Sequence, residues 1–235
     1  MAKDRTVPIR WNALDALLLW VLQVVGTALW VSLLVAVIYD GDRPVPLPLW
    51  FLTIGQFVLW SAYGFGPVVI TRRKGNGPVK DLGAKIERWD LPIGVAAGAI
   101  LQLVVLPVVY WPILRLVDAD PGKSAQELVD RSDGLGGVLL LVLVVVIAAP
   151  ILEEFFFRGL LLRGLLRWTG EWQAAVVSAV LFALVHIDPI LFPGTFVLGL
   201  LAAAASIRTG RLGPAWGMHV GFNATTLVLL LAGSG

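Results

Sequence analysis

The chain lacks cysteine and is poor in charged residues, and each of these shortages excludes certain kinds of protein or functional site. With no cysteine among 235 residues, the sequence excludes a disulfide framework, a thiolate metal site and a cysteine nucleophile. Only 14% of the residues are charged, whereas 58% are hydrophobic, and the mean hydropathy is +0.85. A water-soluble domain of this size has too few polar residues to cover so much apolar surface. The composition therefore predicts a protein embedded in a lipid bilayer.

The net charge of +2 is also small, and the basic residues lie between apolar runs instead of forming one patch. We therefore expect membrane lipid, and no nucleic acid, as a partner. The first apolar run, Leu14 to Ile38, follows Lys3, Arg5 and Arg10, but it is too long for the apolar region of a signal peptide. It is interpreted as a retained membrane anchor. Since there is no internal repeat or low-complexity linker, residues 1–235 are predicted to form a single transmembrane domain.

Apolar stretches long enough to cross a bilayer, about 20 residues each, recur along the whole chain. They predict an all-α fold, a polytopic transmembrane helix bundle with about seven spans, six to eight being compatible with the pattern. The fifth and sixth segments are short and close together, so re-entrant or tilted segments also fit there. Polar stretches at 71–90 and 118–137 are predicted to be solvated loops, and Pro107 and Pro112 to kink the third span. The predicted spans lie near 13–38, 49–70, 91–117, 138–166, 172–187, 190–207 and 214–232.

The distribution of basic residues predicts the orientation of this bundle. If seven spans alternate, 14 of the 18 Lys and Arg residues fall on the side of the N-terminus. Because Lys and Arg concentrate on the cytoplasmic side of membrane proteins, the N-terminus is expected in the cytoplasm and the tail 232–235 outside. The four basic residues on the other side are Arg43, Arg115, Lys123 and Arg131.

Ionisable residues within the apolar segments are the strongest functional signal. They cost several kcal/mol in hydrocarbon, so those that are present usually face a cavity and have a function. The fourth span carries Glu153, Glu154 and Arg158. Glu154 and Arg158 are four residues apart, the spacing of a helical ion pair. Glu153 points about 100° away on a helix, which leaves it available for chemistry.

The only two histidines, His186 and His219, also lie in hydrophobic segments. Asn223 follows His219 by one helical turn, and Phe182 precedes His186 by one turn. If the fourth and fifth spans are antiparallel about a turn at 169–170, Glu153 and His186 lie at the same depth. We therefore expect one polar layer, open to the cytoplasmic side, that contains Glu153, His186, His219 and Asn223.

These side chains have the chemistry needed to hydrolyse a peptide bond. A carboxylate and a histidine at one level can hold a water molecule, and Glu153 would take its proton as general base. His219 and Asn223 would stabilise the oxyanion. Alternatively, Glu153, His186 and His219 could bind zinc and leave an open position for water. The compact H-E-x-x-H arrangement is absent, and the version without metal or other cofactor is favoured.

Three motifs in this order resemble a known family. Glu-Glu-x-x-x-Arg at 153–158, Phe-x-x-x-His at 182–186 and His-x-x-x-Asn at 219–223 resemble the CPBP (CAAX protease and bacteriocin-processing, or Abi) family of intramembrane proteases. Its eukaryotic relatives are the type II CAAX prenyl endopeptidases. The resemblance covers the predicted catalytic core at 138–232, whereas the N-terminal spans within 1–117 carry no signature.

The resemblance implies roles for the motif residues. Glu153 and His186 would activate the water, and His219 and Asn223 would form the oxyanion hole. Glu154 and Arg158 would support the site. Phe182 is interpreted, from its own position, as a packing or lipid-facing side chain with a supporting and no chemical role.

The resemblance also bears on substrate and location. The eukaryotic relatives remove three residues from a prenylated C-terminus, whereas bacterial members are linked to peptide maturation or bacteriocin self-immunity. This compact, loop-poor chain is more similar to the bacterial members. A peptide or membrane-protein substrate in a bacterial plasma membrane is therefore expected in preference to a prenylated C-terminus.

Two other functions fit the same residues. Membrane-embedded Glu and His also relay protons in transporters, although the paired halves common in transporters are not evident here. A non-catalytic immunity or scaffold protein could retain the family fold, but the intact motif residues count against it.

Overall fold

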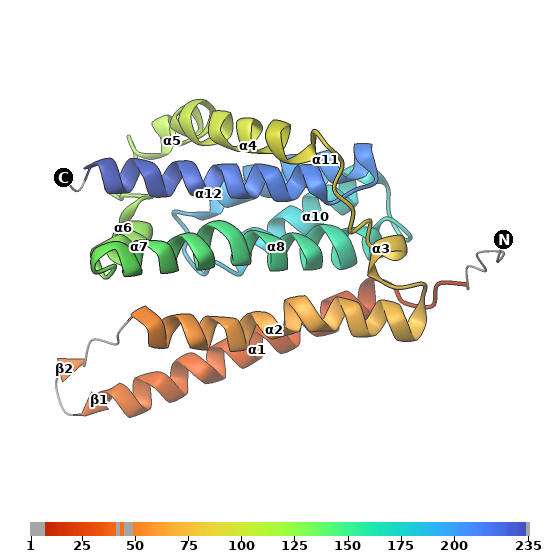
Figure 1. Ribbon diagram of the computed structural model, residues 1–235, viewed down its shortest axis with the longest axis horizontal. Helices are drawn as coiled ribbons and strands as arrows, with labels where there is room; N and C mark the ends of the chain where they lie inside the picture. The colour runs from red at the N-terminus through yellow and green to blue at the C-terminus, as the bar shows by residue number, and fades with distance from the viewer. Residues whose placement is uncertain (1–7, 41–42, 45–48, 234–235) are drawn as a thin grey trace.

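The computed structural model describes residues 8–40, 43–44 and 49–233, and these form a bundle of long helices (Figure 1). The exception is one antiparallel pair of two-residue strands, β1 and β2. The predicted all-α class is confirmed. Lys3, Arg5 and the last two residues of the predicted outer tail lie outside the described residues. The elements are α1 (Ala13–Ile38), β1 (Tyr39–Asp40), β2 (Arg43–Pro44), α2 (Leu49–Lys74), α3 (Pro78–Asp81), α4 (Asp90–Ile100), η1 (Leu101–Val105), α5 (Leu106–Ile113), α6 (Lys123–Asp130), α7 (Gly134–Leu141), η2 (Val142–Ala148), α8 (Ala149–Glu154), η3 (Phe155–Leu161), α9 (Leu162–Leu165), α10 (Glu171–Leu184), α11 (Phe192–Thr209) and α12 (Gly213–Gly233).

The outer faces of the helices are apolar. On α1, the side chains of Leu18, Leu22 and Leu29 are each more than 60% exposed. Such a surface would promote aggregation in water, but it matches the hydrocarbon of a bilayer. Within the described residues, five helical stretches are long and apolar enough to cross a membrane, and α10 is a shorter apolar helix. The chain is therefore an integral, multi-pass membrane protein. Its predicted count of seven spans stays a prediction.

Two prolines coincide with changes in helix geometry. The π-helical segment η1 ends just before Pro107, and η2 ends just before Pro150. Proline has no N–H to donate to the preceding turn, and a wider π-helical turn accommodates this loss. Pro112, in contrast, lies inside α5 without a π-helical segment before it. A third π-helical segment, η3, starts directly after Glu154, and such segments are frequent at functional sites.

The prediction that 71–90 and 118–137 are solvated loops is wrong in part, because both contain helices. In the first stretch the Asp81 carboxylate is buried and accepts a hydrogen bond from Trp11 Nε1 at 3.0 Å. It also accepts one from the backbone N–H of Asn76 at 2.8 Å. This carboxylate therefore joins the start of α1 to the turn after α2. In the second stretch, α6 covers one end of the bundle.

Helices α4 and α12 pack backbone against backbone (Figure 1). A Cβ atom added at Gly98 would lie 2.0 Å from the carbonyl oxygen of Met218, and one at Gly221 would lie 2.2 Å from the carbonyl oxygen of Val95. Only residues without a side chain permit this approach. Since α12 carries His219 and Asn223, these glycine contacts determine where the two side chains stand.

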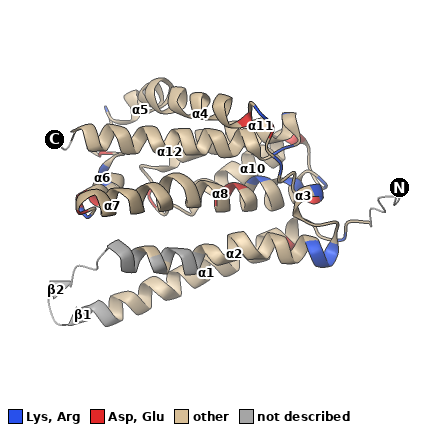
Figure 2. Ribbon diagram, in the orientation of Figure 1, with Lys and Arg blue, Asp and Glu red and all other residues tan. Residues whose placement is uncertain are grey.

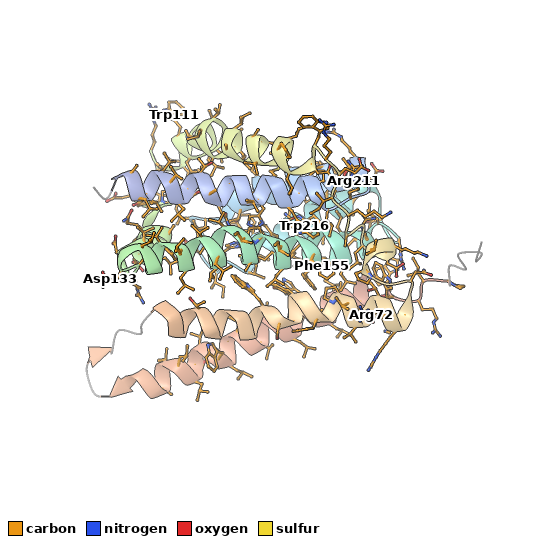
Figure 3. All side chains as sticks on the ribbon, in the orientation of Figure 1. Arg72, Trp111, Asp133, Phe155, Arg211 and Trp216 are labelled. Carbon is orange, nitrogen blue, oxygen red and sulfur yellow. The ribbon has the colours of Figure 1, made fainter. Side chains whose placement is uncertain are left out.

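The N-terminal end of α12 is anchored by an ion pair. Arg211 donates to both carboxylate oxygens of Asp90, at 3.0 Å and 2.8 Å, a bidentate geometry. This hydrogen bonding to Asp90 raises the pKa of Arg211 above its ordinary value. Arg211 lies at the turn between α11 and α12, and Trp216, one turn into α12, reaches toward α8 (Figure 3). Its Nε1 donates to the carbonyl oxygen of Ile151 at 3.2 Å. Helix α12 is thus held from both sides.

The charged residues lie mainly at the two ends of the bundle (Figure 2). One end, here called the α3 end, carries α3 and the basic residues that finish α2, Arg72, Arg73 and Lys74. The opposite end, here called the α6 end, carries α6 and the start of α7. This separation fits a bundle that crosses a bilayer. Arg158, counted above among the basic residues on the side of the N-terminus, is instead fully buried within the bundle.

Candidate active site

The two adjacent glutamates both lie inside the protein, near the middle of the helical stretch from α7 to α9. Glu153 is 8% exposed and Glu154 is fully buried. Arg158 Nη1 donates to Glu154 Oε1 at 2.8 Å, with both side chains fully shielded from solvent. The predicted ion pair between Glu154 and Arg158 is therefore present. A buried carboxylate and guanidinium that compensate each other form a rigid neutral unit.

Arg158 has two further contacts that fix this unit in the bundle. Its Nη2 donates to the carbonyl oxygen of Gly199 in α11 at 3.1 Å. Its guanidinium carbon lies 4.4 Å from the centre of the Phe182 ring in α10, a cation–π distance. Arg158 thus connects the helix of the glutamates to two neighbouring helices.

His219 lies between the two glutamates. Its Nδ1 is 2.9 Å from Glu154 Oε1, and its Nε2 is 3.9 Å from Glu153 Oε2. Because a carboxylate accepts, the hydrogen bond to Glu154 places a proton on Nδ1. The longer distance to Glu153 exceeds that of a direct hydrogen bond but lies within the range of an ion pair. The side chain predicted for the oxyanion hole is therefore also a neighbour of the predicted base.

His186 lies just beyond the end of α10 and has a different partner. Its Nδ1 is 3.0 Å from the carbonyl oxygen of Phe182, an acceptor, so the proton of the neutral ring belongs on Nδ1 and the Nε2 lone pair is free. The next residue, Ile187, has a φ of 54°. A β-branched residue rarely adopts this conformation, and backbone strain of this kind is frequent beside functional side chains. Glu153 interacts electrostatically with the rings of both His186 and His219.

Asn223 lies one turn after His219 on α12. Its Nδ2 donates to the carbonyl oxygen of Val145 at 2.8 Å. Val145 belongs to the π-helical segment η2, where the wider turn leaves backbone carbonyls without helical partners. This hydrogen bond uses one of the two amide hydrogens. The other is available to a ligand.

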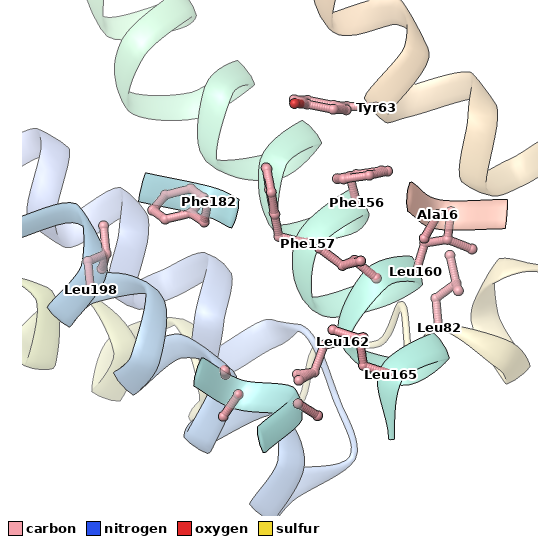
Figure 4. Packing of buried hydrophobic residues seen from close by; sticks show 14 of the residues in the cluster. Ala16, Tyr63, Leu82, Phe156, Phe157, Leu160, Leu162, Leu165, Phe182 and Leu198 are labelled. Atoms are coloured by element: carbon pink, nitrogen blue, oxygen red, sulfur yellow. The ribbon is translucent and has the colours of Figure 1, made fainter. Parts of the chain in front are cut away.

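Phe182 lies beside Phe157 in the buried core (Figure 4) and also contacts the two site histidines. Its ring is fully buried and lies edge-on to the rings of Phe157, His186 and His219, with centre-to-centre distances of 5.2, 5.2 and 5.6 Å. The supporting role of Phe182 stays a prediction, and these contacts are the ones through which it would act. The ring fixes both imidazoles relative to each other and to Arg158.

Glu153, His186, His219 and Asn223 line one cavity of about 780 Å³. The cavity lies between the hairpin of α1 and α2 and the remaining helices, and its wall also includes Gln23, Tyr63 and Gln102. Most of the lining is apolar. The sequence thus correctly placed four polar side chains from three helical regions around one space.

The cavity extends toward the α6 end of the bundle. Its wall includes Gly122 and Ala125 near the start of α6, and Leu230 near the end of α12. On the α3 side of the site, the fully buried Phe156, Leu160 and other core residues fill the interior. The cavity therefore lies in the half of the molecule away from α3.

No side chains within the described ranges form a metal site as they stand. No group of three or more His, Cys, Asp or Glu side chains there is arranged to hold a metal ion. Nδ1 of His219 is used by Glu154, and Nδ1 of His186 by a backbone carbonyl, which leaves Nε2 as the ring atom that could face a ligand. Glu153, His186 and His219 are not grouped as a metal site among the described residues, and the metal-free and zinc-dependent versions of the site both stay predictions.

Sequence reasoning missed several groups that shape the site. The carbonyl oxygens of Gly199 and Val145 are backbone atoms, and no residue type marks them. Tyr63, which lines the cavity, comes from α2, where it is one aromatic residue among many in an apolar helix. Only the three-dimensional packing identifies these groups.

The fold and the site together define a multi-pass membrane protein with a buried acid and histidine centre. Residues 135–225 match a family described as type II CAAX prenyl endopeptidase Rce1-like. This segment contains every motif residue named above, and the resemblance to the CPBP proteases is confirmed. The segment matches a protease family, so the chain is a peptidase whose substrate is a peptide or protein in the membrane. No curated protein and no solved structure matches the chain.

Proposed function

We propose that the protein is a CAAX-type or peptide-processing intramembrane endopeptidase in which Glu153 and His186 activate a water molecule. The observation that carries the proposal is the chain of contacts from Arg158 through Glu154 and His219 to Glu153, at the wall of the cavity that His186 also lines. A bacterial plasma membrane is the proposed location. A peptide or membrane protein is the preferred substrate over a prenylated C-terminus.

The charges at the site support a role in proton transfer. Glu154 and Arg158 neutralise each other. If the site is electrically neutral, Glu153 and His219 share one proton. The pair then exists either as a carboxylate with an imidazolium or as a carboxylic acid with a neutral imidazole. In the first form, Glu153 is ready to accept a proton and Nε2 of His219 is ready to donate a hydrogen bond. Proton transfer needs such a poised pair.

The reaction would proceed through a tetrahedral intermediate. Water held by Glu153 and the free Nε2 of His186 attacks the peptide carbonyl carbon as its proton passes to Glu153. The new C–O bond places negative charge on the carbonyl oxygen, which accepts hydrogen bonds from His219 Nε2–H and the second amide hydrogen of Asn223. Glu153 then gives its proton to the amide nitrogen as the C–N bond breaks. The products are a carboxylic acid and an amine, and the acid then gives its proton to the amine.

Substrate access is proposed at the α6 end, toward which the cavity extends. The charge distribution predicts that the α3 end faces the cytoplasm. Access at the α6 end is therefore compatible with the expected cytoplasmic opening only if the bundle has the reverse orientation. The chain has no cysteine, and single-cysteine variants therefore report topology directly. A membrane-impermeant maleimide applied to intact cells labels Gly122→Cys, and not Lys80→Cys, if the α6 end faces outward. The opposite pattern supports the cytoplasmic opening.

Activity is tested with purified protein and three sets of peptides: a prenylated C-terminal peptide, its unprenylated twin and a mixture of apolar peptides. Glu153→Gln and His186→Ala are expected to abolish cleavage while the protein remains folded. Glu171→Gln, which changes an exposed glutamate at the start of α10, is the matched control and retains activity. Wild-type turnover by Glu153→Gln on a cleaved substrate refutes the proposed base.

Metal dependence is tested separately on the active wild-type protein. Undiminished cleavage in the presence of a strong chelator, with no zinc bound by elemental analysis, supports the metal-free mechanism. Loss of cleavage that zinc restores contradicts it.

A further inference from the structure

We propose that Tyr63, contributed by α2, is a further catalytic residue that donates a hydrogen bond to the peptide carbonyl oxygen as it becomes an oxyanion. This inference rests on the proposed function. Tyr63 lies outside the segment 135–225 that matches the protease family. It would therefore make the N-terminal hairpin of α1 and α2 part of the catalytic machinery.

The ring of Tyr63 is fixed against the helix that carries Glu153 (Figure 4). It stacks on Phe156 with a centre-to-centre distance of 4.5 Å and an interplanar angle of 21°. It also meets the edge of Phe157 at 5.4 Å. Since Phe156 and Phe157 follow Glu153 within about one helical turn, the ring has a defined place beside the catalytic glutamate. In Figure 4 the hydroxyl is at the end of the ring farthest from α2.

The hydroxyl is placed to serve a ligand. Tyr63 is only 3% exposed, lines the same cavity as Glu153 and interacts electrostatically with that carboxylate. No hydrogen bond joins its hydroxyl to another residue in the described part of the chain. Because the hydroxyl oxygen is not among the fully enclosed atoms that lack a hydrogen bond, it opens into the cavity, where its donor can take a partner. A substrate in the cavity supplies one.

A second tyrosine in the same cavity wall, Tyr110, differs from Tyr63 because its hydroxyl has protein partners. The hydroxyl of Tyr110 donates to the carbonyl oxygen of Ile190 at 2.7 Å and accepts from the backbone N–H of Gly194 at 3.2 Å. Its hydrogen-bonding capacity is used to hold the start of α11. Tyr110 is therefore a structural residue, and Tyr63 has its donor free.

The chemistry of the oxyanion hole calls for this donor. His219 already directs Nδ1 at Glu154, so it donates to the oxyanion only through Nε2 and only when the ring is protonated. Asn223 already gives one amide hydrogen to Val145. A tyrosine hydroxyl is protonated throughout the neutral pH range and donates whatever the state of His219. Tyr63 would thus supplement a donor set that is otherwise small.

The test compares Tyr63→Phe with Tyr110→Phe on a fluorogenic peptide cleaved by the wild-type protein. Both changes remove one oxygen atom and keep the ring. Tyr63→Phe is expected to lower kcat by a factor on the order of 10² with little change in KM, the effect of losing one oxyanion donor. Its unfolding midpoint is expected to stay at the wild-type value, because no protein hydrogen bond is lost. Tyr110→Phe lowers the midpoint but retains kcat per folded molecule.

A binding measurement provides a readout besides turnover. A peptide phosphinate carries a tetrahedral centre with charged oxygens, whereas the corresponding uncleaved peptide in the inactive Glu153→Gln background does not. Tyr63→Phe is expected to weaken phosphinate binding by the same factor as kcat and to leave peptide binding unchanged. Equal kcat and equal phosphinate affinity in Tyr63→Phe and wild type overturn the role of Tyr63, while the loss of activity in Glu153→Gln still supports the protease. If the wild type neither cleaves peptides nor binds the phosphinate, both proposals fail.

Discussion

The contact between α4 and α12 provides a test of how the site is positioned, because α4 itself carries none of the proposed catalytic residues. The perturbation is Gly98→Ala, which adds a single methyl group. That group would lie 2.0 Å from the carbonyl oxygen of Met218 and 2.6 Å from the backbone nitrogen of Phe222. Ordinary contacts begin at about 3.4 Å. The two helices must therefore separate by more than 1 Å, since neither neighbouring atom belongs to a flexible side chain.

The expected magnitude follows from what α12 carries. His219 is the next residue after Met218, and its Nδ1 lies 2.9 Å from Glu154 Oε1. A shift of about 1 Å lengthens that contact beyond hydrogen-bond range. A displacement of this size in a catalytic group costs on the order of 10² in rate. The overpacking itself costs roughly 1–3 kcal/mol of stability.

The assay measures kcat and the unfolding midpoint of Gly98→Ala beside those of Gly26→Ala. Gly26 is a helical glycine in α1 with no atom within 4 Å of an added Cβ, so its variant is the matched control and retains wild-type kcat. Gly98→Ala is expected to lose about 10²-fold in kcat even at temperatures where it is fully folded. Wild-type kcat in folded Gly98→Ala would refute the conclusion that the glycine contact positions His219.

Three further variants test other contacts. Glu154→Gln leaves the buried Arg158 without its compensating charge and should lower stability by about 3–5 kcal/mol, which unfolding in detergent measures; Glu154→Gln combined with Arg158→Met should recover most of that loss. Ile187→Gly removes the strain of a φ of 54° and should raise the unfolding midpoint, since such strain costs about 1–3 kcal/mol; a lower midpoint contradicts the strain. Asp90→Asn weakens the partly exposed pair with Arg211 and should cost about 1 kcal/mol or less with nearly unchanged kcat, whereas a large loss of kcat would give this pair a role in catalysis.

The membrane fold and the residues that line the candidate site were predictable, because long apolar segments and the ionisable residues within them are both visible in the sequence. Glu153, Glu154, His186 and His219 stand out since ionisable groups are expensive in apolar segments. The helical spacing of Glu154 and Arg158 was enough to predict their ion pair, and the structure has it at 2.8 Å. The hairpin about residues 169–170 correctly brought Glu153 and His186 to the same cavity.

Other features depend on long-range packing that no local pattern encodes. The sequence paired Glu153 with His186, but the nearer imidazole is that of His219, which lies 3.9 Å from Glu153 and shares Glu154 with Arg158. The burial of Asp81 depends on Trp11, which is 70 residues away in the sequence. The direction of the cavity depends on which half of the bundle is filled by large side chains, and hydropathy is alike at both ends.

The cavity is lined by two kinds of residue, those that belong to a sequence motif and those that do not. Acid and base groups must be buried in apolar helices to perform this chemistry, so they form motifs that a single sequence displays, all within 135–225. Groups such as Tyr63, Gln23 and Gln102 come from α1, α2 and η1 and line the same space. A tyrosine or glutamine in an apolar helix needs no ionised partner and forms no motif, although its hydrogen bonds can select a substrate. The residues that determine peptide specificity are therefore expected mainly in the N-terminal helices, which carry no sequence motif. Changes at Gln23 or Gln102 should alter which peptides are cleaved while leaving the Glu153-dependent chemistry intact.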